Sequence, residues 1–137
     1  MDLSKLPSTF YRVSLKVIVL DDQARLLVGR VDDGSYELPG GGFEHNETIE
    51  ECLDRELEEE LGVKIKSLGG VVCLYRNDNP RGFKSIKIAL EANLENHDFK
   101  YGEITEAKFL SKDEFLDLPF SQDEDGIKNC VNKIWPE

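Results

Sequence analysis

The residues best suited to chemistry lie together in residues 41–63, which read GGFEHNETIEECLDRELEEELGV. Seven carboxylates fall between Glu50 and Glu60, with one cation, Arg55, among them. Hard oxygen ligands of this kind favour Mg²⁺ or Mn²⁺, whose shells are typically completed by water and by substrate phosphates. These residues therefore predict a divalent-cation site, with Mg²⁺ as the expected cofactor and Mn²⁺ as the alternative.

A helical wheel at about 100° per residue divides these acids into two groups. The apolar side chains form one arc, made of Ile49, Cys52, Leu53 and Leu57. The opposite side carries four acids that we interpret as solvated, namely Glu50, Glu51, Asp54 and Glu58. Glu56 and Glu60 fall within the apolar arc, and Glu59 borders it. Carboxylates four residues apart repel each other, and a bound cation removes the cost of placing them near a core.

The strands that must position this helix are predicted from alternating and β-branched segments. We expect strands over Arg12–Leu20, Ala24–Arg30, Tyr36–Leu38, Val63–Arg76, Phe83–Leu94 and Ala107–Leu110. The first two of these are expected to pair as a hairpin across a short turn. The glycines Gly40–Gly42, which follow Pro39, are expected to be irregular and to let the backbone approach a ligand closely.

Capping signals predict where the helices begin and end. Thr48 with Glu51 forms a capping box, and Gly62 suits the left-handed end of the same helix. A second capping box, Ser111 with Glu114, begins a short helix. A C-terminal amphipathic helix is predicted from the helical spacing of Ile127, Val131 and Ile134. Strands mixed with helices indicate an α/β class, with helices covering both faces of a mixed sheet.

Size, charge and cysteine content limit the function classes. The chain has 137 residues, enough for a single domain over 1–137, and a net charge of −11. Such a surface repels nucleic-acid polymers, while a small phosphorylated ligand stays possible through a bound cation. Cys52, Cys73 and Cys130 form neither a disulfide framework nor a zinc pattern, so we expect reduced thiols in a cytoplasmic protein. Neither a signal peptide nor a membrane span is expected, and a homodimer is left open.

The acidic segment as a whole resembles a known family. Every position of the Nudix box is matched by Gly41, Glu47, Arg55-Glu56-Leu57, Glu58, Glu59-Glu60, Leu61 and Gly62-Val63. The preceding Leu38-Pro39-Gly40 is also similar to the usual approach to the box. The resemblance implies the Nudix fold, an α/β/α sandwich whose central mixed sheet is flanked by helices. One departure is Asn46, which stands where many members have glycine; asparagine tolerates left-handed backbone, so we expect the turn to survive.

The resemblance also implies roles for individual residues. The metal-binding glutamates of the family are matched by Glu56, Glu59 and Glu60. Gly40 matches a position whose backbone carbonyl often completes the metal shell. Glu47 matches the glutamate beside the cluster, and Arg55 the arginine that holds the carboxylates in position, so both join Glu59 among the catalytic candidates.

The implied reaction is attack of water on a diphosphate linkage, assisted by the metal. A carboxylate must take the proton from that water. In this family the base is not always in the box, and the segment Tyr101–Phe109 resembles the acidic segment before a late strand in many members. Glu103 is our first candidate for the base and Glu106 the second, with a plain surface acid as the alternative interpretation.

Substrate residues are less well defined. Tyr36 could stack on a base or simply pack, and Arg76, Arg81 and Phe83 flank a loop that could touch phosphate and base. Arginines on loops are more often solvated. The implied substrate is a nucleoside diphosphate derivative or a (deoxy)nucleoside triphosphate, and the short chain does not separate these two. The alternative is a Nudix domain that binds a ligand without catalysis; such domains usually lose box carboxylates, whereas this chain keeps them.

Overall fold

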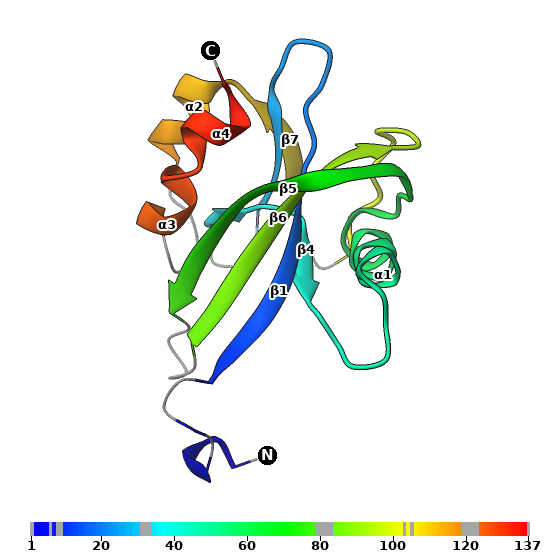
Figure 1. Cartoon of the computed structure of the whole chain (residues 1–137). Coiled ribbons are helices and arrows are strands. Elements are labelled where there is room, and N and C mark those ends of the chain that lie inside the picture. The colour runs from blue at the N-terminus through cyan, green and yellow to red at the C-terminus, as the bar shows by residue number, and fades with distance from the viewer. Residues whose placement is uncertain are drawn as a thin grey trace.

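The computed structural model describes residues 2–5, 7, 10–30, 34–78, 84–102, 104, 106–118 and 124–136. Within that part of the chain the strands form two sheets, with α1 (Ile49–Leu61) on one side and the C-terminal helices on the other (Figure 1). A short 3-10 helix, η1 (Leu3–Lys5), precedes the first strand. The α/β architecture expected from the sequence, with helices on both sides of mixed strands, is confirmed.

The larger sheet is built around β1 (Tyr11–Ile18). On one edge β1 pairs antiparallel with β4 (Gly40–Gly42), and on the other it pairs parallel with β6 (Lys84–Leu94). The long strand β5 (Ile65–Asp78) pairs antiparallel with β6, giving the order β4-β1-β6-β5 among the described strands. Helix α1, which carries the predicted metal-binding glutamates, connects β4 to β5, so it lies beside the edge of the sheet that β4 forms.

The smaller sheet holds the remaining strands. β2 (Leu26–Arg30) pairs antiparallel with β3 (Tyr36–Glu37) and with β7 (Glu106–Leu110). The expected hairpin of the first two strands is therefore wrong in the main, because both edges of β1 are already occupied by β4 and β6. What remains of it is a short antiparallel turn, with an isolated bridge between Leu20 and Leu26 and backbone hydrogen bonds from the Asp21 N–H to the Arg25 carbonyl and from the Leu27 N–H to the Val19 carbonyl.

Two apolar clusters hold the helices against the sheets. On one face, Leu53 and Leu57 of α1 pack with Leu15 and Val17 of β1. On the other face, Phe115 and the C-terminal helices pack with buried residues that include Ile18 of β1. Side chains of β1 thus alternate between the two clusters, as period-two geometry requires.

The glycine segment differs from the expectation that it would be irregular. Gly40–Gly42 forms β4, with Gly40 opposite Lys16 and Gly42 opposite Ser14. Gly40 has φ 135°, and a Cβ atom there would overlap the carbonyl oxygen of Leu15. Glycine is needed here because the strand lies closer to β1 than a side chain would allow.

The ends of α1 are as the sequence predicts. The Thr48 hydroxyl accepts from the Glu51 N–H, the Glu51 carboxylate accepts from the Thr48 N–H, and Gly62 is left-handed with φ 65°. Asn46 also adopts positive φ, at 67°, so the turn survives without glycine. Ile49 was expected in the buried arc but is 42% exposed, because it begins the helix next to the surface loop 43–48.

The C-terminal part of the chain is divided into more and shorter helices than expected. α2 (Lys112–Asp117) begins at the predicted capping box, and α3 (Glu124–Lys128) and α4 (Val131–Ile134) replace the single amphipathic helix. The three residues that predicted it, Ile127, Val131 and Ile134, are all buried. None of the helices in the described part of the chain combines the length and apolarity that crossing a membrane requires.

Candidate active site

Arg55 lies at the centre of the carboxylate cluster. Its Nη2 and Nε bind the two carboxylate oxygens of Glu47 at 2.9 and 3.2 Å. Its Nη1 donates to Glu56 Oε1 at 2.8 Å and lies 3.8 Å from Oε2 of Glu59. Its Nη2 also donates to the Gly42 carbonyl at 3.1 Å. One guanidinium therefore joins the loop, the edge strand β4 and two glutamates of α1.

The paired Glu47 is a poor base. Its hydrogen bonds from Arg55 and from the Glu44 N–H hold the pKa of the Glu47 carboxyl at about 2. The carboxylates of Glu47 and Glu56 in turn raise the pKa of the Arg55 guanidinium. A carboxylate with so low a pKa takes a proton reluctantly near neutral pH. The geometry suits Glu47 to orienting Arg55.

Glu60 occupies the opposite kind of environment. It is 4% exposed, and its Oε1 accepts from the Gly40 N–H at 2.8 Å. Burial raises the pKa of the Glu60 carboxyl to about 8, opposed by the charge of Lys16 and by the Gly40 hydrogen bond. Among the described residues no second donor reaches this carboxylate. A buried oxygen without a donor fits a position where a cation could bind.

Two neighbouring glycines bring the carboxylates against the strand. A Cβ atom on Gly41 would overlap the carboxylate of Glu56. Since Gly40 binds Glu60, the two consecutive glycines of β4 contact glutamates one helical turn apart. Gly40 thus lies against Glu60, and Gly41 lies against Glu56.

The carbonyl of Gly40, expected in a metal shell, is engaged by Lys16. The Lys16 ammonium lies 3.3 Å from this oxygen and 3.1 Å from the carbonyl of Leu38, and its side chain is only 4% exposed. A carbonyl oxygen has two lone pairs, so Lys16 leaves one of them for another partner. Sequence reasoning missed Lys16, although its alternation with Leu15 and Val17 could have placed it on the non-apolar face of β1.

The residues present suit a hard divalent cation in their chemistry. The donors at the β4–α1 edge are all oxygens, from Glu56, Glu59, Glu60 and the backbone of Gly40. In the conformation described, no three His, Cys, Asp or Glu side chains of the described residues converge closely enough to form a metal cluster. Glu56 is instead turned toward Arg55. An ionised carboxylate has acceptor positions on both oxygens, so this contact leaves Glu56 capacity to bind a cation as well.

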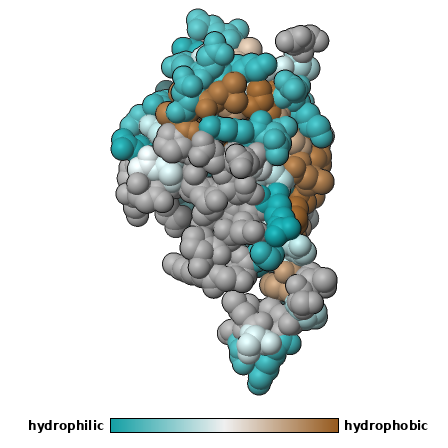
Figure 2. Space-filling model, turned by 90° about the vertical axis from the view of Figure 1, so that its left-hand side faces the viewer, coloured by the Kyte–Doolittle hydropathy of each residue, from teal (hydrophilic) through white to brown (hydrophobic). Residues whose placement is uncertain are grey.

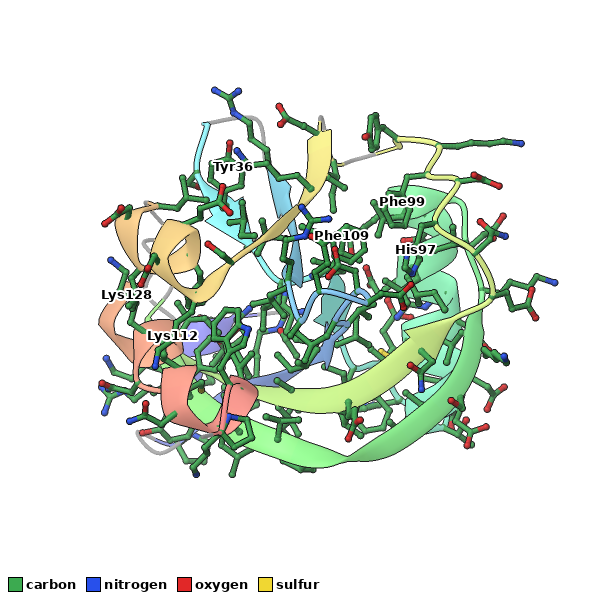
Figure 3. All side chains as sticks on the ribbon, turned by 90° about the horizontal axis from the view of Figure 1, so that it is seen from above. Tyr36, His97, Phe99, Phe109, Lys112 and Lys128 are labelled. Atoms are coloured by element: carbon green, nitrogen blue, oxygen red, sulfur yellow. The ribbon has the colours of Figure 1, made fainter. Side chains whose placement is uncertain are left out.

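The proposed substrate residues are spread over the molecule. Tyr36 is 8% exposed and belongs to a buried cluster, and the Lys108 ammonium lies 4.7 Å from the centre of its ring. Figure 3 shows Tyr36 to the left of Phe109, which packs against the other apolar cluster. These contacts favour packing over stacking on a base. Arg76 lies exposed on β5, while Arg81 and Phe83 fall outside the described residues.

Glu103 also falls outside the described residues, but the segment before it is placed. The Lys100 N–H donates to the Leu61 carbonyl at 2.8 Å, and the Gly102 N–H donates to the Glu60 carbonyl at 3.1 Å. A Cβ atom on Gly102 would overlap the carbonyl oxygen of Glu59. The chain leading to Glu103 is therefore fixed to the end of α1 that carries the glutamates. Glu106, the second candidate, lies on β7 with an oxygen 3.9 Å from Nη1 of Arg30.

Comparison with known proteins adds to this geometry. The family model of the NUDIX domain matches residues 10–129. An ADP-ribose pyrophosphatase from Methanocaldococcus jannaschii is 34% identical over 118 residues, which cover 82% of this chain and 69% of that protein. An RNA pyrophosphohydrolase from Saccharophagus degradans is 46% identical over 55 residues, which cover 39% of this chain and only 32% of that protein. The solved MutT protein from Methanosarcina mazei Go1 shares the fold, with a TM-score of 0.79, 20% identity and coverage of 94% and 96% of the two chains.

Proposed function

Because the chain belongs to the NUDIX domain family, we propose that it is a pyrophosphohydrolase that cleaves the diphosphate linkage of a small nucleotide by attack of water at phosphorus. The single observation that carries this proposal is the Arg55 network, which holds Glu47, Glu56 and Glu59 around the edge strand β4. A domain that only bound ligands would not need a complete set of carboxylates so arranged. The substrate class is a nucleoside diphosphate derivative or a nucleoside triphosphate, with ADP-ribose as the first compound to test, since a relative matching 82% of this chain is an ADP-ribose pyrophosphatase.

The cation is proposed to bind at Glu56, Glu59, Glu60 and the Gly40 carbonyl. When bound, Mg²⁺ or Mn²⁺ would neutralise phosphate oxygens and lower the pKa of the attacking water. Oxygen-only donors favour these hard ions over zinc or copper. Arg55 then orients the glutamates, and Glu47 fixes Arg55 through its two-oxygen contact.

Glu103 is proposed as the base that takes the proton from water. It follows Gly102, whose N–H is bonded to the carbonyl of Glu60, so the chain enters Glu103 beside the glutamate helix.

Two further expectations remain proposals. A cytoplasmic location is supported by Cys52, Cys73 and Cys130, all of which are buried thiols without disulfides. A homodimer is supported by edge strand β5, where Val71 and Leu74 are 57% and 60% exposed. Apolar residues also gather near the top and along the right-hand side of the space-filling view (Figure 2).

A substrate panel tests the function. The purified chain is incubated with ADP-ribose, other nucleoside diphosphate derivatives and nucleoside triphosphates, each with Mg²⁺, with Mn²⁺ and with chelator. Release of phosphate, pyrophosphate or nucleoside monophosphate is expected with at least one compound and only with the cation. Binding of these nucleotides without any turnover would favour the alternative, a ligand-binding module.

A further inference from the structure

A row of basic side chains crosses the face of the larger sheet opposite α1. Arg12 and Lys16 come from β1, and Lys87 comes from the neighbouring strand β6. Ser14 and Lys87 are Cα partners in the parallel register, and the Lys87 ammonium donates to the Ser14 hydroxyl at 3.3 Å. We call Arg12, Ser14, Lys16 and Lys87 the basic floor.

Burial increases steadily along the basic floor. Arg12 is exposed, Lys87 is half-buried, and Lys16 is buried. The next inward residue of β1 on this face, Ile18, already belongs to the apolar cluster under the C-terminal helices. The basic floor therefore runs from solvent to the edge of the core, and its inner end is shielded from water, where charge acts more strongly.

The basic floor is connected to the proposed metal site. Lys16 binds the Gly40 carbonyl, while the Gly40 N–H binds Glu60. At the outer end, a Cβ atom on Gly42 would lie 3.6 Å from Nη2 of Arg12, and the Gly42 carbonyl accepts from Arg55. The single strand β4 thus separates the basic floor from the glutamates.

Two cations of the basic floor, Lys16 and Lys87, have no carboxylate oxygen closer than 3.9 Å in the described part of the chain. The Lys16 ammonium lies 3.9 Å from Oε1 of Glu37. Lys87 has a neutral hydroxyl as its partner and no ion pair with a described carboxylate. Burial, Lys16 and Arg12 lower the pKa of the Lys87 ammonium to about 8, while Glu37 opposes this. Such an accumulation of cations is unusual in a chain of net charge −11, and it is relieved by a bound anion.

We propose that the basic floor binds a phosphoryl group of the substrate, additional to the diphosphate that is cleaved, and so selects nucleotides that carry a further phosphate. The inference rests on the proposed function, since it places a second part of the same substrate. Lys87 and Arg12 would contact this phosphate, with the Ser14 hydroxyl as a further donor. Lys16 would act as a positioning residue, because its hydrogen bonds to two carbonyls hold it in place.

Equilibrium binding tests the inference without any hydrolysis. Adenosine monophosphate is compared with adenosine 2′,5′-bisphosphate and adenosine 3′,5′-bisphosphate by titration calorimetry at pH 7. At least one bisphosphate is expected to bind the native chain about tenfold or more tightly than the monophosphate, as one charge-assisted contact allows. In Lys87→Met this advantage is expected to fall below about threefold.

Lys84→Met is the matched control, because Lys84 lies on the same strand three residues earlier and alternation places it on the opposite face. This variant is expected to keep the full advantage. Equal binding of monophosphate and bisphosphates by the native chain, or an advantage that survives Lys87→Met, would overturn the inference. Titration with inorganic phosphate tests whether the basic floor binds free phosphate rather than a phosphoryl group of a nucleotide. If inorganic phosphate binds only when Lys87 is present, and neither bisphosphate binds more tightly than the monophosphate, the floor is a site for free phosphate. That result would also overturn the inference. Turnover in the substrate panel is measured independently of these binding experiments. Failure of the proposed function can therefore be distinguished from failure of the inference about the basic floor.

Discussion

Lys16 and Gly40 face each other in the register of β1 and β4, and the Lys16 ammonium lies 3.3 Å from the Gly40 carbonyl oxygen. The same ammonium lies 3.1 Å from the Leu38 carbonyl. Both carbonyls are in buried residues, so Lys16 satisfies acceptors that water does not reach.

Lys16→Met is therefore expected to destabilise the fold. Loss of the ammonium leaves two buried carbonyls without this donor, at a cost of about 2–4 kcal/mol in the free energy of unfolding. Urea denaturation measures this change. Lys64→Met, at an exposed position just after α1, is the control and should change the free energy little. Equal midpoints for the two variants would contradict the structural role of Lys16.

Lys87→Met is expected to stabilise the fold, in contrast to Lys16→Met. The pKa of the Lys87 ammonium is lowered from 10.5 to about 8 in the folded chain, mainly by burial. Between these two values the unfolded chain binds more protons, so this group makes stability rise with pH across that window. At pH 7 the buried charge of Lys87 lowers the free energy of unfolding. Lys87→Met removes this charge and should raise the melting temperature by about 2–6 °C.

The pH profile of stability gives a second measurement on the same variant. In the native chain, deprotonation of Lys87 should make the free energy of unfolding increase with pH between about pH 8 and 10.5. Lys87→Met should lack this contribution. Lys84→Met should keep it. If the native and Lys87→Met profiles are parallel over this range, Lys87 is not strained by its surroundings.

Cation binding should stabilise the chain through the acids on one face of α1. A ligand bound only by the native state at about 100 times its dissociation constant adds about 2.7 kcal/mol. The melting-temperature shift with saturating Mg²⁺ or Mn²⁺ should shrink strongly in Glu60→Gln and persist in Glu58→Gln, whose side chain is exposed. An undiminished shift in Glu60→Gln would remove Glu60 from the metal site.

Gly41→Ala should damage the site more than the fold. Its Cβ atom would overlap the Glu56 carboxylate, which must then move away from β4. We expect Mn²⁺ affinity, measured by calorimetry, to fall by about ten- to a hundredfold, in the range seen when the supports of metal ligands are lost. Gly70→Ala is the matched control, because no atom lies within 4 Å of its added Cβ position. If Gly41→Ala binds Mn²⁺ with the affinity of the native chain, metal binding does not depend on the present position of the Glu56 carboxylate.

Glu103→Gln tests the base. Loss of a general base should lower turnover by about two to four powers of ten while leaving substrate affinity nearly unchanged. Glu106→Gln and Glu47→Gln rank the rivals in the same assay. Glu47→Gln is expected to act through Arg55 and to weaken metal binding as well, which separates its role from that of a base.

Local signals in the sequence were sufficient for α1. Its start at Thr48, its left-handed end at Gly62 and the burial of Glu60 follow from residues within a few positions of each other. Helices suit such reasoning because their hydrogen bonds and side-chain faces are set by near neighbours.

The sheets were harder to foresee because their pairing is non-local. Three glycines carry no side-chain period, and Gly40–Gly42 becomes a strand only because β1 lies beside it. The separation of β1 from β2 likewise depends on β6, more than fifty residues later, taking the other edge of β1. The basic floor was missed for the same reason, since Ser14 and Lys87 meet only through this parallel pairing.

The position of β1 between β4 and β6 also bears on how this protein could change its substrate over evolution. A central strand paired at both edges belongs to the part of a fold that opens least, so its amides should exchange with solvent among the slowest. Arg12, Ser14 and Lys16 are therefore presented by a scaffold that hardly moves between substrates. New specificity on this face would arise by exchanging single side chains along β1 and β6, with no remodelling of the backbone that carries them.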